Sequence, residues 1–177
     1  MRILLGVSIA AMALASAAQP ANAVVETRYQ RAQGGVVCRL TDVSLNTTVK
    51  AKATGFRNEG TVSQFVICGM ESANSQEAIG TITGLSIGLY SLNGVSKNVT
   101  CTAVNGYANS TPLYSAKTIA TNAGVAAATI SFDAADFGGT PGQPLAQNDY
   151  WSITCNLPAQ TSVGFMTTSF NVNTPAS

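Results

Sequence analysis

Residues 81–104 read TITGLSIGLYSLNGVSKNVTCTAV, and this stretch decides the fold class. Its first half carries apolar side chains in near alternation, and its second half places Val99, Cys101 and Ala103 on one face. A period of two residues is the pattern of a β-strand with one buried face. Asn93-Gly94 between the halves is a strong hairpin signal, so we expect two paired antiparallel strands here.

Similar short runs, separated by turn residues, occur along the rest of the chain. They predict strands at residues 35–40, 46–54, 61–70, 80–92, 96–104, 113–120, 125–132, 149–157 and 162–172. Eight or nine short strands and no helix of convincing length predict an all-β chain. We expect a single antiparallel β-sandwich, either immunoglobulin-like or jelly-roll, with a barrel as the weaker option.

The expected domain boundaries follow from the same reading. Residues 35–172 form the predicted β-sandwich domain, preceded by a loose N-terminal lead at residues 24–34 and followed by a flexible tail at residues 173–177. Residues 1–23 have the parts of a secretory signal peptide: Arg2, an apolar stretch, and Ala21-Asn22-Ala23 as the cleavage pattern. We therefore expect a secreted or periplasmic protein with no membrane span after cleavage. A transmembrane anchor is the competing interpretation, and the Ala-rich stretch before a cleavage pattern disfavours it.

Four cysteines, Cys38, Cys68, Cys101 and Cys155, each lie in an expected strand. In an oxidising compartment an even number of cysteines indicates disulfides, and four cysteines allow three pairings. We favour Cys38 with Cys68 and Cys101 with Cys155, because each pairing joins strands from the same half of the chain. The close spacing of a redox-active pair does not occur, so we interpret both bridges as structural.

Charge limits the partners that the chain can attract. Without residues 1–23, eight basic and eight acidic side chains remain, so we expect no nucleic-acid partner. Most of the basic side chains fall before residue 60, namely Arg28, Arg31, Arg39, Lys50, Lys52 and Arg57. The simpler interpretation is a set of solvent-facing positions on early strands. The alternative is a patch for an acidic polysaccharide or another component of the cell envelope.

The chain has no histidine, which removes the Ser-His-Asp arrangement, the histidine general base and the histidine metal ligand. The acidic residues form no evident catalytic pair, although hydrolysis by two carboxylates cannot be judged from a sequence. We therefore expect no enzyme activity, no catalytic residues and no cofactor. Trp151 lies beside a cysteine-bearing strand, and we expect it in the core.

One loop, DAADFGGTPGQPLAQN at residues 133–148, is long and rich in Gly, Pro and Asp. Asp133, Asp136 and Asp149 bracket it, and carboxylates are suitable ligands for Ca²⁺. Phe137 and Tyr150 lie around the same loop, and aromatic rings commonly contact sugars or peptides. We take these five residues as a candidate ligand-binding or calcium-binding loop. The alternative is that the aspartates serve the turns themselves through bonds to their own backbone.

Three cysteine-bearing stretches carry a resemblance. They are FVICGM at residues 65–70, NVTCTAV at residues 98–104 and YWSITCNLP at residues 150–158. Together they resemble a loosely defined group of secreted bacterial β-sandwich proteins with a late Cys-x-Leu-Pro before the final strand, here Cys155 to Pro158. The resemblance covers about residues 36–172, and the group's Cys-Pro at the earlier cysteine is Cys68-Gly69 here. It implies an exported, disulfide-bonded β-sandwich and no particular activity.

These observations favour a non-catalytic binding or structural module of the cell envelope or extracellular space, with an envelope glycan or another protein as partner. One alternative is a subunit of a surface filament or adhesive assembly completed by strand addition. Such a subunit needs a detachable N-terminal strand, and residues 24–31 (VVETRYQR) are too polar to serve well in that role. The other alternative is a carbohydrate-active enzyme that uses carboxylates.

Overall fold

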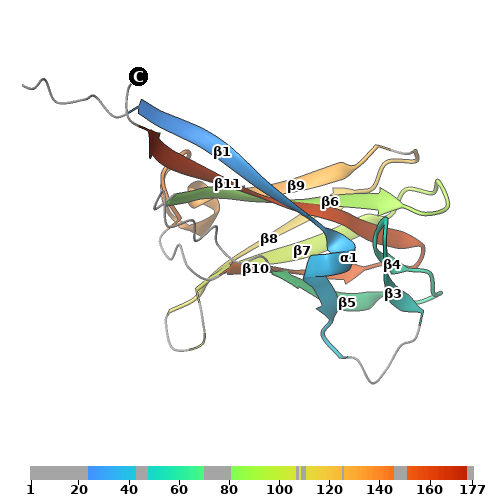
Figure 1. The fold of residues 1–177 in the computed structure, drawn as a ribbon. Coiled ribbons are helices and arrows are strands. Elements are labelled where there is room, and N and C mark those ends of the chain that lie inside the picture. Colours follow the sequence, from blue (N-terminus) through green and yellow to red (C-terminus); the bar gives the residue numbers. More distant parts are fainter. Residues whose placement is uncertain are drawn as a thin grey trace, which may run out of the picture.

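A computed structural model of the chain describes residues 24–42, 48–69, 81–106, 108, 111–124, 126–145 and 151–174. The predicted signal peptide lies outside these residues. The described residues form two antiparallel sheets stacked face to face (Figure 1). None of the helices in this part of the chain is long and apolar enough to cross a membrane.

Sheet A has the order β3-β4-β11-β6-β9, with β1 paired to β11 beside β4, and sheet B has the order β2-β5-β10-β7-β8. The elements are β1 (Val24–Gln33), α1 (Gly34–Val37), β2 (Cys38–Leu40), β3 (Val49–Lys52), β4 (Gly55–Asn58), β5 (Gln64–Gly69), β6 (Thr81–Ser91), β7 (Asn98–Asn105), β8 (Leu113–Ala120), β9 (Ala128–Asp133), the 3₁₀ turn η1 (Ala134–Phe137), β10 (Trp151–Leu157) and β11 (Thr161–Thr174).

The strand order identifies a jelly roll. Each of the successive pairs β4–β5, β6–β7, β8–β9 and β10–β11 has one strand in each sheet. The central strands then run in matching order, β4-β11-β6-β9 over β5-β10-β7-β8. This is the double-sheet arrangement of a jelly roll, so the all-β sandwich prediction is confirmed and the immunoglobulin-like alternative is not adopted.

The hairpin predicted at Asn93-Gly94 is wrong. Strand β6 pairs with β9 and β11 in sheet A, whereas β7 pairs with β8 and β10 in sheet B. The local turn signal is sound, because Gly94 has φ 75° and the Asn93 side chain accepts a hydrogen bond from the Val95 N–H. The turn nevertheless connects the two layers. Both strands carry an apolar face, and stacking those faces across the sandwich buries both at once.

The N-terminal lead predicted at residues 24–34 is also wrong. Residues 24–33 form β1, whose ten residues all pair with β11 from Phe165 to Thr174. Nine of the ten are exposed, so the strand has no apolar alternation that would reveal it. It forms because β11 is long and offers a free edge of backbone donors and acceptors. Strand β11 also takes in residues 173 and 174 of the predicted tail.

The predicted number of strands is too low, because the structure describes eleven. The two unpredicted strands are β1 and β4. The sequence predicts no strand at β4 because its first and last residues, Gly55 and Asn58, favour turns, yet Phe56 is buried in the core. A helical turn, α1, also occupies the first half of the strand predicted at residues 35–40.

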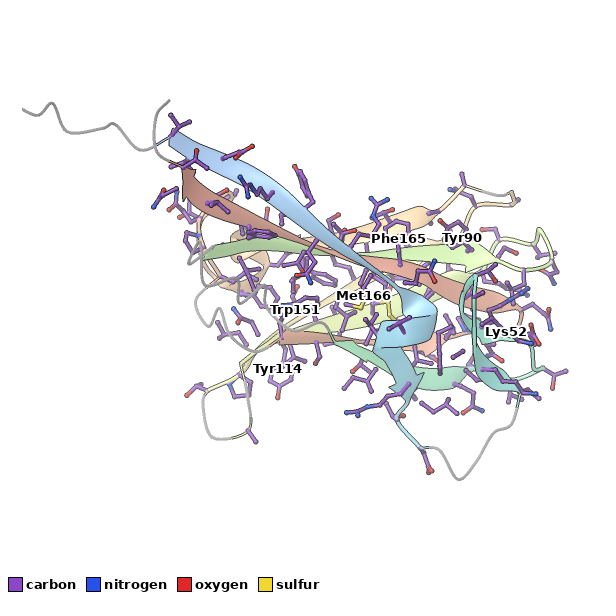
Figure 2. All side chains as sticks on the ribbon, in the orientation of Figure 1. Lys52, Tyr90, Tyr114, Trp151, Phe165 and Met166 are labelled. Atoms are coloured by element: carbon purple, nitrogen blue, oxygen red, sulfur yellow. A yellow bond between two sulfur atoms is a disulfide. The ribbon has the colours of Figure 1, made fainter. Side chains whose placement is uncertain are left out.

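The core lies between the sheets. Sheet A contributes Leu85, Ile87, Leu89, Phe132 and Met166, and sheet B contributes Val66, Val99, Ile153 and Leu157, all of them buried. Figure 2 shows Met166 between the two layers, close to a disulfide. Trp151 is only 6% exposed and belongs to this core, as predicted.

The predicted disulfide pairing is confirmed, with Cys38 joined to Cys68 and Cys101 joined to Cys155. Both bridges lie inside sheet B and connect residues that face each other across adjacent strands. Disulfides persist in oxidising compartments, which places the folded chain outside the reducing cytosol. The loops that they close span 30 and 54 residues. In the chain-entropy model these lengths correspond to about 3.6 and about 4.2 kcal/mol of stabilisation.

We therefore predict that Cys101→Ala/Cys155→Ala destabilises the fold more than Cys38→Ala/Cys68→Ala. The first pair closes the longer loop and is fully buried in central strands, whereas the second ties the short edge strand β2. Denaturant unfolding of the two double variants measures the free energy of unfolding. An equal loss, or a larger loss for the Cys38 pair, would contradict the ranking.

Candidate functional site

The predicted aspartate loop begins with a capping box at η1. The Asp133 carboxylate accepts a hydrogen bond from the Ala135 N–H at 2.9 Å, and the Asp136 carboxylate accepts one from the Asp133 N–H at 2.9 Å. Lys117 Nζ also donates to Asp136 Oδ2 at 2.7 Å. Both carboxylates therefore serve the local turn. Within the described residues, no group of three His, Cys, Asp or Glu side chains suits a metal ion.

The other predicted members of this loop have different outcomes. Phe137 is 9% exposed and packs in the core, so its ring is not available to a ligand at the surface. The 3₁₀ turn explains this position, because it directs the ring inward just after β9. Asp149 and Tyr150 lie outside the described residues, so calcium or ligand binding by the whole loop stays a prediction.

The outer face of sheet A carries a different site, which the sequence reading did not identify. Along β6, the core residues Leu85, Ile87 and Leu89 alternate with outward-facing residues, two of which are Ser86 and Gly88. Four neighbouring outward positions carry hydroxyl groups, namely Thr129 and Ser131 on β9 and Thr167 and Ser169 on β11. The register aligns Ser131, Ser86 and Thr167 in one row across three strands. Small side chains thus form a low floor on the outer face.

Longer side chains border this floor on both sides. Tyr29 and Arg31 of β1 stand on one side, and Lys117 with Asp136 stands on the other. The space between them is a pocket of about 710 Å³ whose lining includes Thr83, Gly84, Ser86, Thr129, Ser131, Thr167 and Ser169. Six of these seven residues carry a hydroxyl group, which can both donate and accept hydrogen bonds.

Two aromatic rings pack against the backbone of the sheet beside this pocket, and one of them, Phe165, lines it. Gly88 and Phe165 face each other across β6 and β11, and a Cβ atom on Gly88 would collide with the Phe165 ring. In the same way, a Cβ atom on Gly164 would collide with the Tyr90 ring. The two rings meet edge to face, with centroids 6.5 Å apart. The two glycines therefore let both rings rest directly on the backbone, which fixes their positions.

Arg31 is held above this aromatic pair. Its guanidinium carbon lies 4.6 Å from the centroid of the Phe165 ring, and its Nε donates to Thr167 Oγ1 at 3.2 Å. The contact of the cation with the aromatic face and the hydrogen bond to a strand residue both favour this arrangement of the side chain. Arg31 therefore presents its remaining N–H donors at the border of the pocket.

A second pocket continues the first on the far side of the rings. It has a volume of about 560 Å³ and is lined by Thr54, Arg57, Tyr90, Ser91, Leu92, Ser162, Gly164 and Phe165. Phe165 lines both pockets, so they adjoin on one face. We call the two pockets together the outer groove. In Figure 2 the labelled rings of Tyr90 and Phe165 project from the outer side of sheet A, away from the disulfides.

A separate pocket beside α1 lacks these features. It has a volume of about 560 Å³, and its described lining has no aromatic ring and one charged side chain, Arg39. It adjoins Gly69, where the described part of β5 ends. The outer groove is therefore the better-defined candidate site.

Comparison with known proteins gives little further information. No protein-family model matches the chain, and no curated protein matches it. Among solved structures, a family 11 carbohydrate-binding module from Clostridium thermocellum, in complex with a β-1,3-1,4-mixed-linked tetrasaccharide, is similar at 12% identity and a TM-score of 0.35, over 88% of this chain and 89% of that chain. The module TmCBM61, in complex with β-1,4-galactotriose, is similar at 7% identity and a TM-score of 0.37, over 83% and 88%. TM-scores this low leave both likenesses without bearing on function.

The sequence did contain one signal for the outer groove. Gly84 and Gly88 occupy outward positions of a strand, where glycine costs stability unless something packs over it. The last strand contains the matching residues, since Phe165 packs on Gly88 and Gly164 receives the Tyr90 ring. Only the strand register, which places β11 beside β6, brings them together.

A double-mutant cycle tests the ring placement. We predict that Gly88→Ala lowers the free energy of unfolding by about 1–3 kcal/mol, because the new methyl group displaces the Phe165 ring. In a Phe165→Ala background the same substitution should cost almost nothing, since the collision is gone. Gly69→Ala is the matched control, because its added Cβ meets nothing closer than 3.9 Å. Equal costs of Gly88→Ala in both backgrounds would contradict this packing.

Proposed function

We propose that the protein is an exported, non-catalytic glycan-binding module that holds a polysaccharide chain in the outer groove. The observation that carries the proposal is the Tyr90 ring, held against Gly164 and Phe165, in a pocket that adjoins the hydroxyl-lined floor. Sugar rings have apolar faces that stack on aromatic rings and hydroxyl edges that hydrogen-bond to polar side chains. The outer groove offers both kinds of contact on a rigid sheet.

The chemistry of the groove favours binding over hydrolysis. The described carboxylates in its lining are Asp133 and Asp136, and both are engaged in the η1 capping box. Asp136 is also paired with Lys117 at 2.7 Å. A two-carboxylate hydrolase needs one group to give a proton and another to act as a base or nucleophile. Carboxylates committed to capping and an ion pair are poor candidates for those roles.

An exported location fits this role, since the disulfides require an oxidising compartment and glycans are abundant in the envelope and outside the cell. We propose the periplasm or the extracellular space as the site of action. The expected signal peptide at residues 1–23 supplies the route.

Tyrosine substitutions test the location of binding. We predict that Tyr90→Ala raises the dissociation constant for the polysaccharide roughly tenfold, which is a loss of about 1.4 kcal/mol of binding free energy, because the stacking surface is lost. Tyr114→Ala is the matched control, since Tyr114 is 65% exposed on sheet B, on the opposite side of the sandwich (Figure 2). Affinity electrophoresis against a panel of soluble polysaccharides, followed by calorimetry, gives the constants. Equal effects of the two substitutions, or binding to no polysaccharide, would refute the proposal.

A second candidate function, assembly by strand exchange, is favoured by the attachment of β1. This strand is held by its ladder with β11, and nine of its ten residues are exposed. Because it buries little apolar surface, its release costs mainly backbone hydrogen bonds, which β1 of another copy could replace. In Figure 1, β1 and β11 extend together beyond the body of the sandwich.

If strand exchange operates, a bridge between β1 and its own β11 should abolish assembly. Thr27 and Asn171 face each other across the two strands, and their side chains hydrogen-bond at 3.0 Å. Thr27→Cys/Asn171→Cys should therefore remain monomeric where the wild type forms linear polymers, as measured by light scattering and electron microscopy. The matched control is Thr100→Cys/Thr118→Cys across β7 and β8. A wild type that stays monomeric at all concentrations excludes this function.

A further inference from the structure

We propose that the outer groove is specific for an acidic polysaccharide and that Arg31 binds the carboxylate of one of its sugar units. This inference rests on the proposed glycan-binding function and adds the class of ligand and the residue that selects it. Two observations on Arg31 support this inference. Its side chain contacts Phe165 and Thr167, and it forms no ion pair with an acidic residue among the described residues.

The fixed position of Arg31 has two sources. The guanidinium stacks over Phe165 at 4.6 Å, and Nε donates to Thr167 Oγ1 at 3.2 Å. These contacts use the face of the guanidinium and one donor, and they leave its terminal nitrogens available. Parallel N–H donors on a planar guanidinium match the two oxygens of a carboxylate. Because the side chain is already ordered, little conformational entropy is lost when a carboxylate binds.

Lys117, Asp136 and Arg57 around the groove are already paired, whereas Asp133 and Lys50 take part in none of the described ion pairs. The described ion pairs join Arg28 to Glu26, Lys117 to Asp136, and both Lys52 and Arg57 to Glu59. Arg31 takes part in none of them. The residue in register with Arg31 across β11, β6 and β9 is Ser131, and Asp133 lies two residues further along β9.

The rest of the outer face adds positive charge on the same side. Lys50 and Arg57 are aligned with Ser162 and Tyr90 in one row across sheet A. Lys52 lies two residues along on the same face and shares the single Glu59 carboxylate with Arg57. Figure 2 shows Lys52 at the end of the sandwich that β3 and β4 form. Arg31 and Arg57 thus line the groove itself, and Lys50 and Lys52 lie outside its lining on the same face, an arrangement that suits a chain with repeated negative groups.

This arrangement gives a role to four of the six basic residues that lie between residues 24 and 60. Arg31, Lys50, Lys52 and Arg57 occupy one face of sheet A, whereas Arg28 is paired with Glu26 on the opposite face of β1 and Arg39 belongs to sheet B. Four of the six thus gather on the face that carries the outer groove. The sequence order alone could not separate these four from the other two.

The test compares a polyuronate with the same polymer after chemical reduction of its carboxyl groups to primary alcohols. Wild-type protein should bind the polyuronate at least roughly tenfold more tightly than the reduced polymer. Arg31→Gln should remove that preference, and Arg31→Lys should restore only part of it because the ammonium lacks the planar fork. Arg28→Gln is the matched control from the same strand and should keep the full preference. Thermal unfolding confirms that all three variants fold.

The possible results separate this inference from the function on which it rests. Equal affinity for the two polymers, with binding still sensitive to Tyr90→Ala, would overturn the carboxylate site and leave glycan binding in place. Equal losses in Arg31→Gln and Arg28→Gln would show diffuse charge attraction and would also overturn it. A sulfated polymer that binds as tightly as the polyuronate and depends equally on Arg31 would overturn the assignment to a carboxylate. Binding to neither polymer nor to any neutral glycan would overturn both proposals.

Discussion

The alternation of side chains along β6 and β11 is the constraint on which the rest of the structure depends. These neighbouring strands occupy the middle of sheet A, and every second side chain must enter the core. Leu85, Ile87 and Met166 fill the inner face. The remaining positions then face outward over the full length of the sheet, and this is where glycine, serine and aromatic residues gather. One register therefore produces both the core and the outer groove.

The sequence was sufficient for features that depend on local pattern. Period-two alternation predicted an all-β sandwich, and the even number of cysteines predicted two disulfides, whose pairing the sequence did not decide although the favoured one is found. Cys101 points inward with Val99, as the alternation required. These predictions succeeded because burial on one face of a strand leaves a direct trace in the sequence.

Features that depend on pairing between distant strands could not be predicted in this way. Asn93-Gly94 has the local chemistry of a hairpin, but the two apolar strands beside it gain more burial by stacking than by pairing. Strand β1 is recognisable only through its partner, since its own side chains are exposed on both faces. The same holds for the outer groove, which joins Arg31, Gly88 and Phe165 from three separate parts of the chain. The candidate loop at residues 133–148 was visible because its residues are adjacent in sequence, and its described aspartates instead cap η1.

The central claim is that glycan binding occurs on the outer face of sheet A, and amide chemical shifts measured during titration with an acidic oligosaccharide test it most directly. We expect the perturbed amides to cluster on the outer groove, at Arg31, Gly88, Tyr90 and Phe165, while those of β7 and β8 stay unchanged. A cluster on the outer face of sheet B, or around the pocket beside α1, would contradict it.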